Sequence, residues 1–400
     1  MLFTDCGKIF SILCLAAALV SDAAAAGNSA PRPDLPPLPT EATGHSATLP
    51  QSYPDGWFLV QDMAFHHMLD GRVVVIDPTA KTEPRQFKGM FNNSLIGNIA
   101  ISRRRHEIYS VETFYSRGNR GKRTDVVTIY DTRTLSPVGE VVYPKPKRFM
   151  GMPERYALVP IDNDRLLLSF DFTPATSVSV INLATRKIIN DVEIPGCTFV
   201  YPTGKRGFTS ICADGGLLST QLDRNGKTVK QTRIKPFFDT NKAPVFERPA
   251  IVNGTAYFFG FAGTVHPVDL SGPVARVGKT WQLVPEDQRG DNWRPGGIAI
   301  VDTDTHGRFY LLMHSGGHDG TQNEPGTEVW VYDAASHKRV SRIRLKTPAL
   351  SVTISGSARP LLLASNVNST LDLYDADTGK WIRTIDGMRM ETPFMAYGLK

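Results

Sequence analysis

The segment TLDLYDADTGKWIRTID, residues 370–386, holds the pattern that decides the fold. A short run of alternating apolar residues ends at Asp375, a turn follows, and a second strand-like run begins at Lys380. Alternation with a period of two is typical of a β-strand, and an Asp side chain accepts hydrogen bonds from the amides just ahead of it, which favours a turn. The segment therefore predicts two strands joined by a tight turn.

The same pattern occurs seven times along the chain. The residue that closes each run is an Asp or Asn, at Asp77, Asp131, Asn182, Asp223, Asp269, Asp333 and Asp375. These positions lie 41 to 64 residues apart, and one four-stranded propeller blade uses roughly 40–50 residues. We therefore expect an all-β protein, a seven-bladed β-propeller over residues 55–400, in which these side chains open turns and take no part in catalysis. The stretch 390–398 is expected to pair with the strand near Trp57 and so close the ring.

The first residues predict an export signal. Lys8 precedes an apolar run at 9–20 and a small-residue stretch ends at Ala26, so we assign 1–26 as a signal peptide cleaved after Ala26. The apolar run is shorter than the roughly 20 residues that span a bilayer, so we expect an exported protein without a membrane anchor. Residues 27–54 are rich in Pro and Ala, which predicts an arm that does not fold alone.

Charge and cysteine usage narrow the function classes. The formal net charge is +6, but Lys and Arg are scattered and form no stripe, which excludes nucleic acid as the expected partner. Two cysteines fall in the signal, and Cys197 and Cys212 remain on two strand-like runs around a turn, which predicts a disulfide. His314 and His318 are separated by glycines and have no third ligand nearby in sequence, so we expect a solvated loop and no metal site.

Two motifs each leave two interpretations open. The basic segment RGKRTD, which contains Arg120, Lys122 and Arg123, is either a solvated hairpin or a polar anchor for another chain. The segment WRPGG, which begins at Trp293 and Arg294, either brings the backbone close to another group or forms a tight bend between blades. The sequence contains no nucleophile elbow, phosphate-binding loop or dinucleotide fingerprint, so no catalytic residue is assigned.

Five segments carry a resemblance when they are taken together and in order. They are 62–77 (DMAFHHMLDGRVVVID), 113–127 (TFYSRGNRGKRTDVV), 172–180 (FTPATSVSV), 210–218 (SICADGGLL) and 293–297 (WRPGG). In combination they resemble the large subunit of the periplasmic quinoprotein amine dehydrogenases, the methylamine and aromatic amine dehydrogenase group. The resemblance extends over nearly the whole mature chain.

This resemblance implies a propeller without a prosthetic group or catalytic residue of its own. A small, disulfide-rich partner subunit would carry tryptophan tryptophylquinone and the catalytic base, in an assembly of two large and two small chains. That periplasmic heterotetramer would oxidise a primary amine to an aldehyde and ammonia and pass electrons to a blue-copper protein, amicyanin-like or azurin-like.

The resemblance also implies roles for a few individual residues. Phe65 falls at the family position whose ring lines or gates the substrate channel, with Met63, Ala64 and His66 beside it. Cys197 and Cys212 match the internal disulfide of the large subunit. The segments around Phe65 and at 210–218 are more like the aromatic amine enzyme, whereas the Pro/Ala-rich arm is more like the methylamine enzyme, so the amine is not identified.

A second interpretation belongs to a different class of function. Propellers host many activities, and an exported propeller of this kind would equally serve as a module that binds a protein or small ligand without oxidoreductase activity. A third interpretation, a propeller that holds pyrroloquinoline quinone itself, requires ligands for the cofactor and an ion at the propeller axis, and the motifs above supply none.

Overall fold

The computed structural model describes residues 48–149, 151–386, 388 and 390–399. The predicted signal peptide and residues 27–47 of the predicted arm lie outside the described residues. The compact unit that contains the described residues is Thr48–Lys400. Residues 48–54 are anchored within it, because the Leu49 amide donates to the Arg133 carbonyl at 2.9 Å and the Tyr53 hydroxyl donates to the Thr132 carbonyl.

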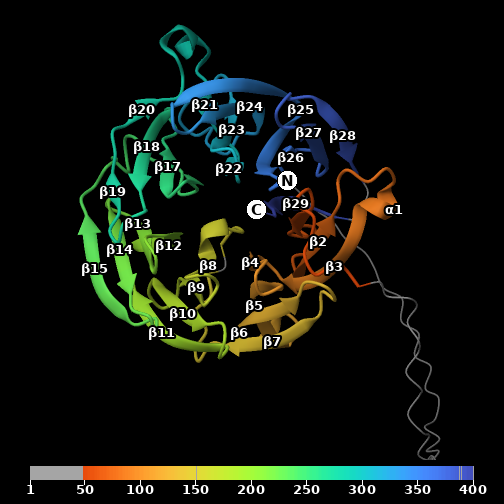
Figure 1. Cartoon of the computed structure of the whole chain (residues 1–400), viewed down its shortest axis with the longest axis vertical. Helices are drawn as coiled ribbons and strands as arrows, with labels where there is room; N and C mark the ends of the chain where they lie inside the picture. The colour runs from red at the N-terminus through yellow and green to blue at the C-terminus, as the bar shows by residue number, and fades with distance from the viewer. Residues whose placement is uncertain (1–47, 150, 387, 389, 400) are drawn as a thin grey trace, which may run out of the picture. The chain divides into compact units, whose positions relative to one another are not determined.

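The regular structure of the described residues is almost entirely β-sheet. The helical elements are short: α1 (Glu83–Gln86) and the 3₁₀ turns η1 (Arg155–Ala157) and η2 (Glu286–Asp291). The strands form six hydrogen-bonded sheets, which follow one another around a ring (Figure 1).

Four of the sheets have four antiparallel strands each. The strands of each of these sheets are named from the innermost to the outermost. The sheet that holds both the first and the last strand contains β29 (Pro393–Gly398), β1 (Phe58–Asp62), β2 (Asp70–Ile76) and β3 (Phe87–Ser94). The next contains β4 (Asn98–Ser102), β5 (Glu107–Arg117), β6 (Arg120–Asp131) and β7 (Pro137–Val142). The third contains β8 (Leu158–Ile161), β9 (Leu166–Asp171), β10 (Ser177–Asn182) and β11 (Lys187–Glu193), and the fourth β12 (Cys197–Pro202), β13 (Gly207–Cys212), β14 (Leu217–Leu222) and β15 (Thr228–Ile234).

The remaining two sheets are larger. A five-stranded sheet contains β16 (Ala250–Val252), β17 (Thr255–Phe259), β18 (Thr264–Asp269), β19 (Arg276–Val277) and β20 (Trp281–Gln282). An eight-stranded sheet contains β21 (Arg294–Pro295), β22 (Val301–Thr303), β23 (Arg308–His314), β24 (Gly326–Asp333), β25 (Lys338–Ile354), β26 (Leu361–Asn366), β27 (Leu371–Asp375) and β28 (Trp381–Ile385).

The prediction of seven separate four-stranded blades is wrong. The described residues form six sheets, because the 17-residue strand β25 pairs with β24 along its first part and with β26 along its second. Two of the seven predicted repeats, those that end at Asp333 and Asp375, therefore lie in one eight-stranded sheet. The all-β propeller class is retained, whereas the predicted number of blades is not.

The turn residues predicted from the sequence do open turns. The Asp131 carboxylate accepts hydrogen bonds from the amides of Arg133 and Thr134, both at 2.9 Å, and Asp375 accepts from the amide of Thr378 at 2.8 Å. Hydrogen bonds of this kind stabilise the charged carboxylate, and the backbone amide of Thr378 lowers the pKa of Asp375 below its usual value. These side chains are therefore used within the fold.

The ring closes through the two ends of the described chain. Strand β29 pairs antiparallel with β1, with Leu59 opposite Tyr397, as expected for the stretch 390–398. A C-terminal strand in this position completes the sheet that the first strands begin, so no inner strand of that sheet is left without a partner.

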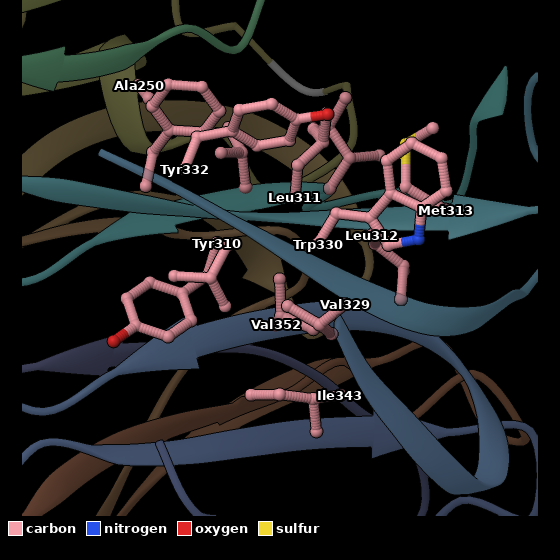
Figure 2. Close-up of a cluster of buried hydrophobic side chains, with 14 of the residues drawn as sticks. Ala250, Tyr310, Leu311, Leu312, Met313, Val329, Trp330, Tyr332, Ile343 and Val352 are labelled. Carbon is pink, nitrogen blue, oxygen red and sulfur yellow. The ribbon is translucent and has the colours of Figure 1, made fainter. Parts of the chain in front are cut away.

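The core lies between neighbouring sheets. Figure 2 shows part of it: Leu311, Met313, Trp330 and Tyr332 lie on one face of the β23–β24 pair, and Val329 lies on the other. Both faces are buried because each sheet packs against a neighbour, which explains why the inner strands read as continuous apolar runs.

Candidate functional site

The strand order places a defined set of connections at one end of the sheets. In an antiparallel sheet that runs from an inner to an outer strand, the connection between the second and third strands and the connection to the next sheet emerge at the same end. We call this end the loop face. We define it by the second-to-third-strand connections 63–69, 118–119, 172–176, 213–216, 260–263 and 315–325, by the connection 367–370 between β26 and β27, and by the longer links 143–154 and 235–249.

Exposed apolar side chains gather on the loop face. Those with the largest exposed fractions in its connections are Leu69 (62%), Phe172 (54%), Met68 (52%), Val367 (45%), Phe65 (37%) and Met152 (37%). Large exposed apolar areas are typical of surfaces that another molecule covers. The loop face is therefore the first candidate for a docking surface.

Phe65 lies in the connection between β1 and β2. Its ring meets that of Phe394 edge to face, with the ring centroids 6.3 Å apart. Of the residues predicted to flank it, Met63 and Ala64 are buried in the core, whereas His66 is exposed. The structure thus leaves Phe65 and His66 at the surface of the loop face and directs Met63 and Ala64 inward.

The base of this connection is held by a buried carboxylate. Asp62 accepts hydrogen bonds from the amides of Ala64 (3.1 Å), Glu391 (2.9 Å) and Thr392 (2.7 Å). The amide of Met63 donates in turn to the carbonyl of Thr392 at 3.1 Å. The Phe65 connection and the segment before β29 therefore move as one piece.

The basic segment lies in a hairpin of two long strands. The residues Arg120, Lys122 and Arg123 belong to the first half of β6, which forms a long hairpin with β5. Arg123 holds Asp125 in a two-point contact of 2.8 Å at each oxygen, so its charge is used within the chain. Arg120 and Lys122 are exposed.

The segment that begins at Trp293 is packed against the molecule itself. The Trp293 ring lies 5.3 Å from the Trp330 ring, and the Arg342 guanidinium lies 4.8 Å from the Trp293 ring centre. Gly297 has φ +116°, and a Cβ there would lie 2.7 Å from the Leu350 carbonyl oxygen, so the position requires glycine. At Gly297 the backbone of this motif therefore lies close to the backbone of another segment, at Leu350.

Arg294 borders a cavity that has a volume of about 520 Å³. Its guanidinium lies 4.8 Å from the Phe261 ring centre and 3.3 Å from a carboxylate oxygen of Asp319. The cavity lies among loop-face segments, with Phe246 and Arg248 also in its lining. A hollow with both aromatic and charged walls suits a protruding side chain of another molecule.

The disulfide predicted between Cys197 and Cys212 is present. The two sulfurs are bonded, and the bridge joins the start of β12 to the end of β13. Both residues lie at the loop-face ends of their strands. The bridge therefore fixes the strand pair beside the connection 213–216.

Sequence reasoning missed the buried ionic groups next to the loop face. Asp171 at the end of β9 is fully buried, and burial raises its pKa to about 7. Arg148 is also buried and donates to Thr113 and to the carbonyls of Leu95, Ile96 and Val111. No motif marks either residue, because Arg148 bonds to groups of a neighbouring sheet and of the 95–97 connection, and Asp171 lies beside Lys147 from the 143–154 link.

The histidines of the 314–318 segment do not form a metal site with other described residues. In the described part of the chain, no group of three or more His, Cys, Asp or Glu side chains is placed to hold a metal ion. His314 is buried and stacks on Phe261, whereas His318 lies in the 315–325 connection. Over the described ranges, none of the helices has the length and apolar character needed to cross a bilayer.

Solved structures share the architecture at low sequence identity. A putative 6-phosphogluconolactonase from Bacteroides fragilis superposes with a TM-score of 0.56 at 11% identity, covering 85% of this chain and 96% of its own. A periplasmic gluconolactonase of Pseudomonas aeruginosa superposes with a TM-score of 0.53 at 14% identity, covering 82% of this chain and 96% of its own. At such identities these likenesses concern the fold alone.

Sequence comparison is more specific. The methylamine dehydrogenase heavy chain of Methylophilus methylotrophus is 29% identical over 330 residues, which cover 79% of this chain and 80% of the relative. That of Methylorubrum extorquens is 29% identical over 279 residues, which cover 68% of this chain and 67% of the relative. The family model of the methylamine dehydrogenase heavy chain (MADH) matches residues 57–396. The chain therefore belongs to the methylamine dehydrogenase heavy-chain family.

Proposed function

We propose that this chain is the large subunit of a periplasmic amine dehydrogenase that oxidises a primary amine to an aldehyde and ammonia. The observation that carries the proposal is the family match, which spans residues 57–396 and so includes all the sheets and the loop face. The apolar side chains gathered on that face support a role in holding a second chain.

In this proposal the chain binds the small subunit and positions the entering amine. The exposed loop-face side chains form the docking surface for a small subunit, and the Phe65 ring narrows the path along which the amine enters. Arg120 and Lys122 at the β5–β6 hairpin and Arg294 beside the 520 Å³ cavity offer cationic groups to the rim of that surface. None of these residues breaks or forms a bond in the reaction.

The redox group belongs to the partner in this proposal. Tryptophan tryptophylquinone on the small subunit takes up the two electrons released as the amine becomes an aldehyde. Two large and two small chains form the working heterotetramer, and a blue-copper protein, amicyanin-like or azurin-like, receives the electrons. The signal peptide predicted at 1–26 is consistent with assembly in the periplasm.

The test is co-expression. We expect that this chain, produced with the small-subunit gene and its maturation proteins, yields a complex that reduces a redox dye only when a primary amine is added. The matched control omits the maturation proteins, and we expect a complex without dye reduction. A properly matured complex that oxidises no aliphatic or aromatic amine would contradict the proposal, and recovery of the chain alone as a stable monomer would favour a binding module.

A further inference from the structure

His67 links two segments of the loop face that are distant in sequence. Its Nδ1 lies 2.9 Å from Oε1 of Glu391, and its Nε2 lies 2.7 Å from Oδ1 of Asp70. Carboxylates only accept hydrogen bonds, and both nitrogens of an imidazole donate only when the ring is protonated. The geometry of the two contacts therefore fits the imidazolium form of His67.

Of these two carboxylates, Glu391 has a further cationic partner in Arg72. Arg72 lies 3.2 Å from Glu391 and 3.2 Å from Asp62. Asp62 holds the base of the 63–69 connection through backbone amides, as described above. The charged groups that face His67 are thus Asp70, at the start of β2, and Glu391, in the segment before β29. Arg72 and Asp62 contact Glu391 in turn. Histidine is the side-chain type whose ordinary pKa lies in the near-neutral range, so a pH effect in this range is expected from the charge of His67.

The 63–69 connection, which His67 links to Glu391, contains backbone conformations that are uncommon for residues other than glycine. Ala64 has φ +47° and Met68 has φ +51°, both in the left-handed region that residues other than glycine rarely adopt. One helical turn joins them, with the Met68 amide 3.0 Å from the Ala64 carbonyl oxygen. Such conformations persist when surrounding contacts over-determine them. Phe65 lies within this turn, so its ring direction depends on those contacts.

We propose that His67 is a positioning residue, whose imidazolium ties the 63–69 connection to the 390–394 segment and thereby sets where the Phe65 ring lies, so that amine selection depends on pH. The selectivity part of this inference rests on the proposed function, whereas the tie itself does not. The relevant ligand class is the primary amine that passes the Phe65 ring.

The direction of the pH effect follows from the two contacts. The hydrogen bond to Asp70, followed by the charge of Glu391, raises the pKa of His67 above its ordinary value. A group with a raised pKa in the folded state holds its contacts fully below the ordinary value and loses them as the pH rises through the raised value. The tie is therefore present in mildly acidic solution and released in alkaline solution.

His66 provides the matched control. It is the neighbouring histidine in the same connection, it is exposed, and it makes no hydrogen bond or ion pair with another described residue. Substitution of His66 by Gln removes a histidine one position before His67 and leaves the contacts of His67 with Asp70 and Glu391 unchanged.

The first experiment measures hydrogen exchange in the full-length subunit at pH 6 and pH 9, corrected for intrinsic exchange rates. We expect the peptide that covers 63–69 to exchange about two- to fivefold more slowly at pH 6 in the wild type and in H66Q, and equally at both pH values in H67Q. An unchanged pH dependence in H67Q would overturn the tie. Overall unfolding temperature serves as the check that H67Q remains folded.

The second experiment uses the complex with the small subunit. The ratio of kcat/KM for a long and a short primary amine is expected to change about two- to fivefold between pH 6 and pH 9 in the wild type and to stay constant in H67Q and in Phe65→Ala. A ratio that follows pH equally in H67Q would overturn the selectivity role. If the wild-type complex oxidises no amine while exchange at 63–69 still depends on His67, the proposed function fails and the tie is retained.

Discussion

At the scale of single residues, the most unusual side chain is the buried carboxyl of Asp171. Its Oδ2 accepts a hydrogen bond from Ser179 at 2.6 Å and lies 3.5 Å from the Lys147 ammonium, while its Oδ1 has no hydrogen-bond partner among the described residues. Burial raises its pKa to about 7, and the hydrogen bond and the ammonium offset only part of that effect. The folded protein therefore favours the neutral acid.

This predicts a specific effect of D171N on stability. Because the folded pKa lies above the unfolded value, the wild type is stabilised at low pH and loses that stability as the pH rises through about 7. Asn keeps the shape of the neutral acid and does not ionise. We therefore expect D171N to be more stable than the wild type at pH 8, by on the order of 4 kcal/mol at most. At pH 4 the two proteins should have similar stability. Urea unfolding at several pH values measures the difference.

Asp191 supplies the control for this prediction. Its carboxylate contacts the same lysine at 2.6 Å but is about half exposed. Burial raises the pKa of Asp171 more than the Asp191 charge does, so we expect D191N to retain most of the wild-type dependence of stability on pH. A D171N protein whose stability difference from the wild type stays constant from pH 4 to pH 8 would show that the Asp171 carboxyl is ionised throughout.

Single residues also show which parts of the site are readable in a sequence. The turn carboxylates such as Asp131 and Asp375 act within a few residues of themselves, so their local pattern is sufficient to predict them. The His67 contact joins residues 324 positions apart, and Arg148 bonds to carbonyls of another sheet connection. Contacts of this kind depend on how the sheets pack, which no local pattern encodes.

At the scale of elements, the pair β12–β13 shows how the disulfide supports an irregular strand. The bridge joins Cys197 to Cys212, and the register shifts just beyond it, between Thr198 and Tyr201. Phe199 at that bulge has φ +61° and its ring packs 5.2 Å from that of Phe170 in the neighbouring sheet. The bulge directs the Phe199 side chain toward the interface between the two sheets. The disulfide bridge holds the strand that contains this bulge.

Removal of this bridge is expected to destabilise the chain. The two cysteines are separated by 15 residues, and closing a loop of that length contributes about 3 kcal/mol. We therefore expect the C197A/C212A double variant to unfold at a lower urea concentration, with a decrease of that order in unfolding free energy. Dithiothreitol should lower the stability of the wild type and leave the double variant unchanged; equal sensitivity of the two proteins would contradict this assignment.

The element that sequence analysis misjudged is β25. Its sequence contains Pro348, which has no N–H to donate, and a strand break near it is the ordinary expectation. In the structure Gly326 pairs with Ala349, and Ala349 also pairs with Asn366, so partners on both sides carry the strand past the proline. Strand continuity here depends on neighbours on both sides, which is why seven separate sheets could not be distinguished from six by counting turns.

At the scale of the whole described unit, exposed apolar side chains occur in two settings. Some lie on outer strands, such as Val138 and Val142 on β7, with Glu140 between them. Others lie in the loop-face connections, where Val367 borders a hollow of about 60 Å³ that Phe394 also lines. Through Phe394, Val367 adjoins the Phe65 connection. A partner chain that covers Phe65 would therefore cover Val367 and leave Val138 in solvent.

This contrast gives a matched pair of variants for the docking surface. Val367 and Val138 are the same residue type and have exposed fractions of 45% and 46%. A glutamate buried in an apolar interface loses its hydration without gaining a partner, so we expect V367E to weaken binding of the small subunit by about tenfold or more. V138E should bind like the wild type, and both variants should keep the wild-type unfolding temperature because both sites are exposed. Binding isotherms with the purified small subunit measure the difference, and equal affinities of V367E and V138E would place the partner on another surface of the propeller.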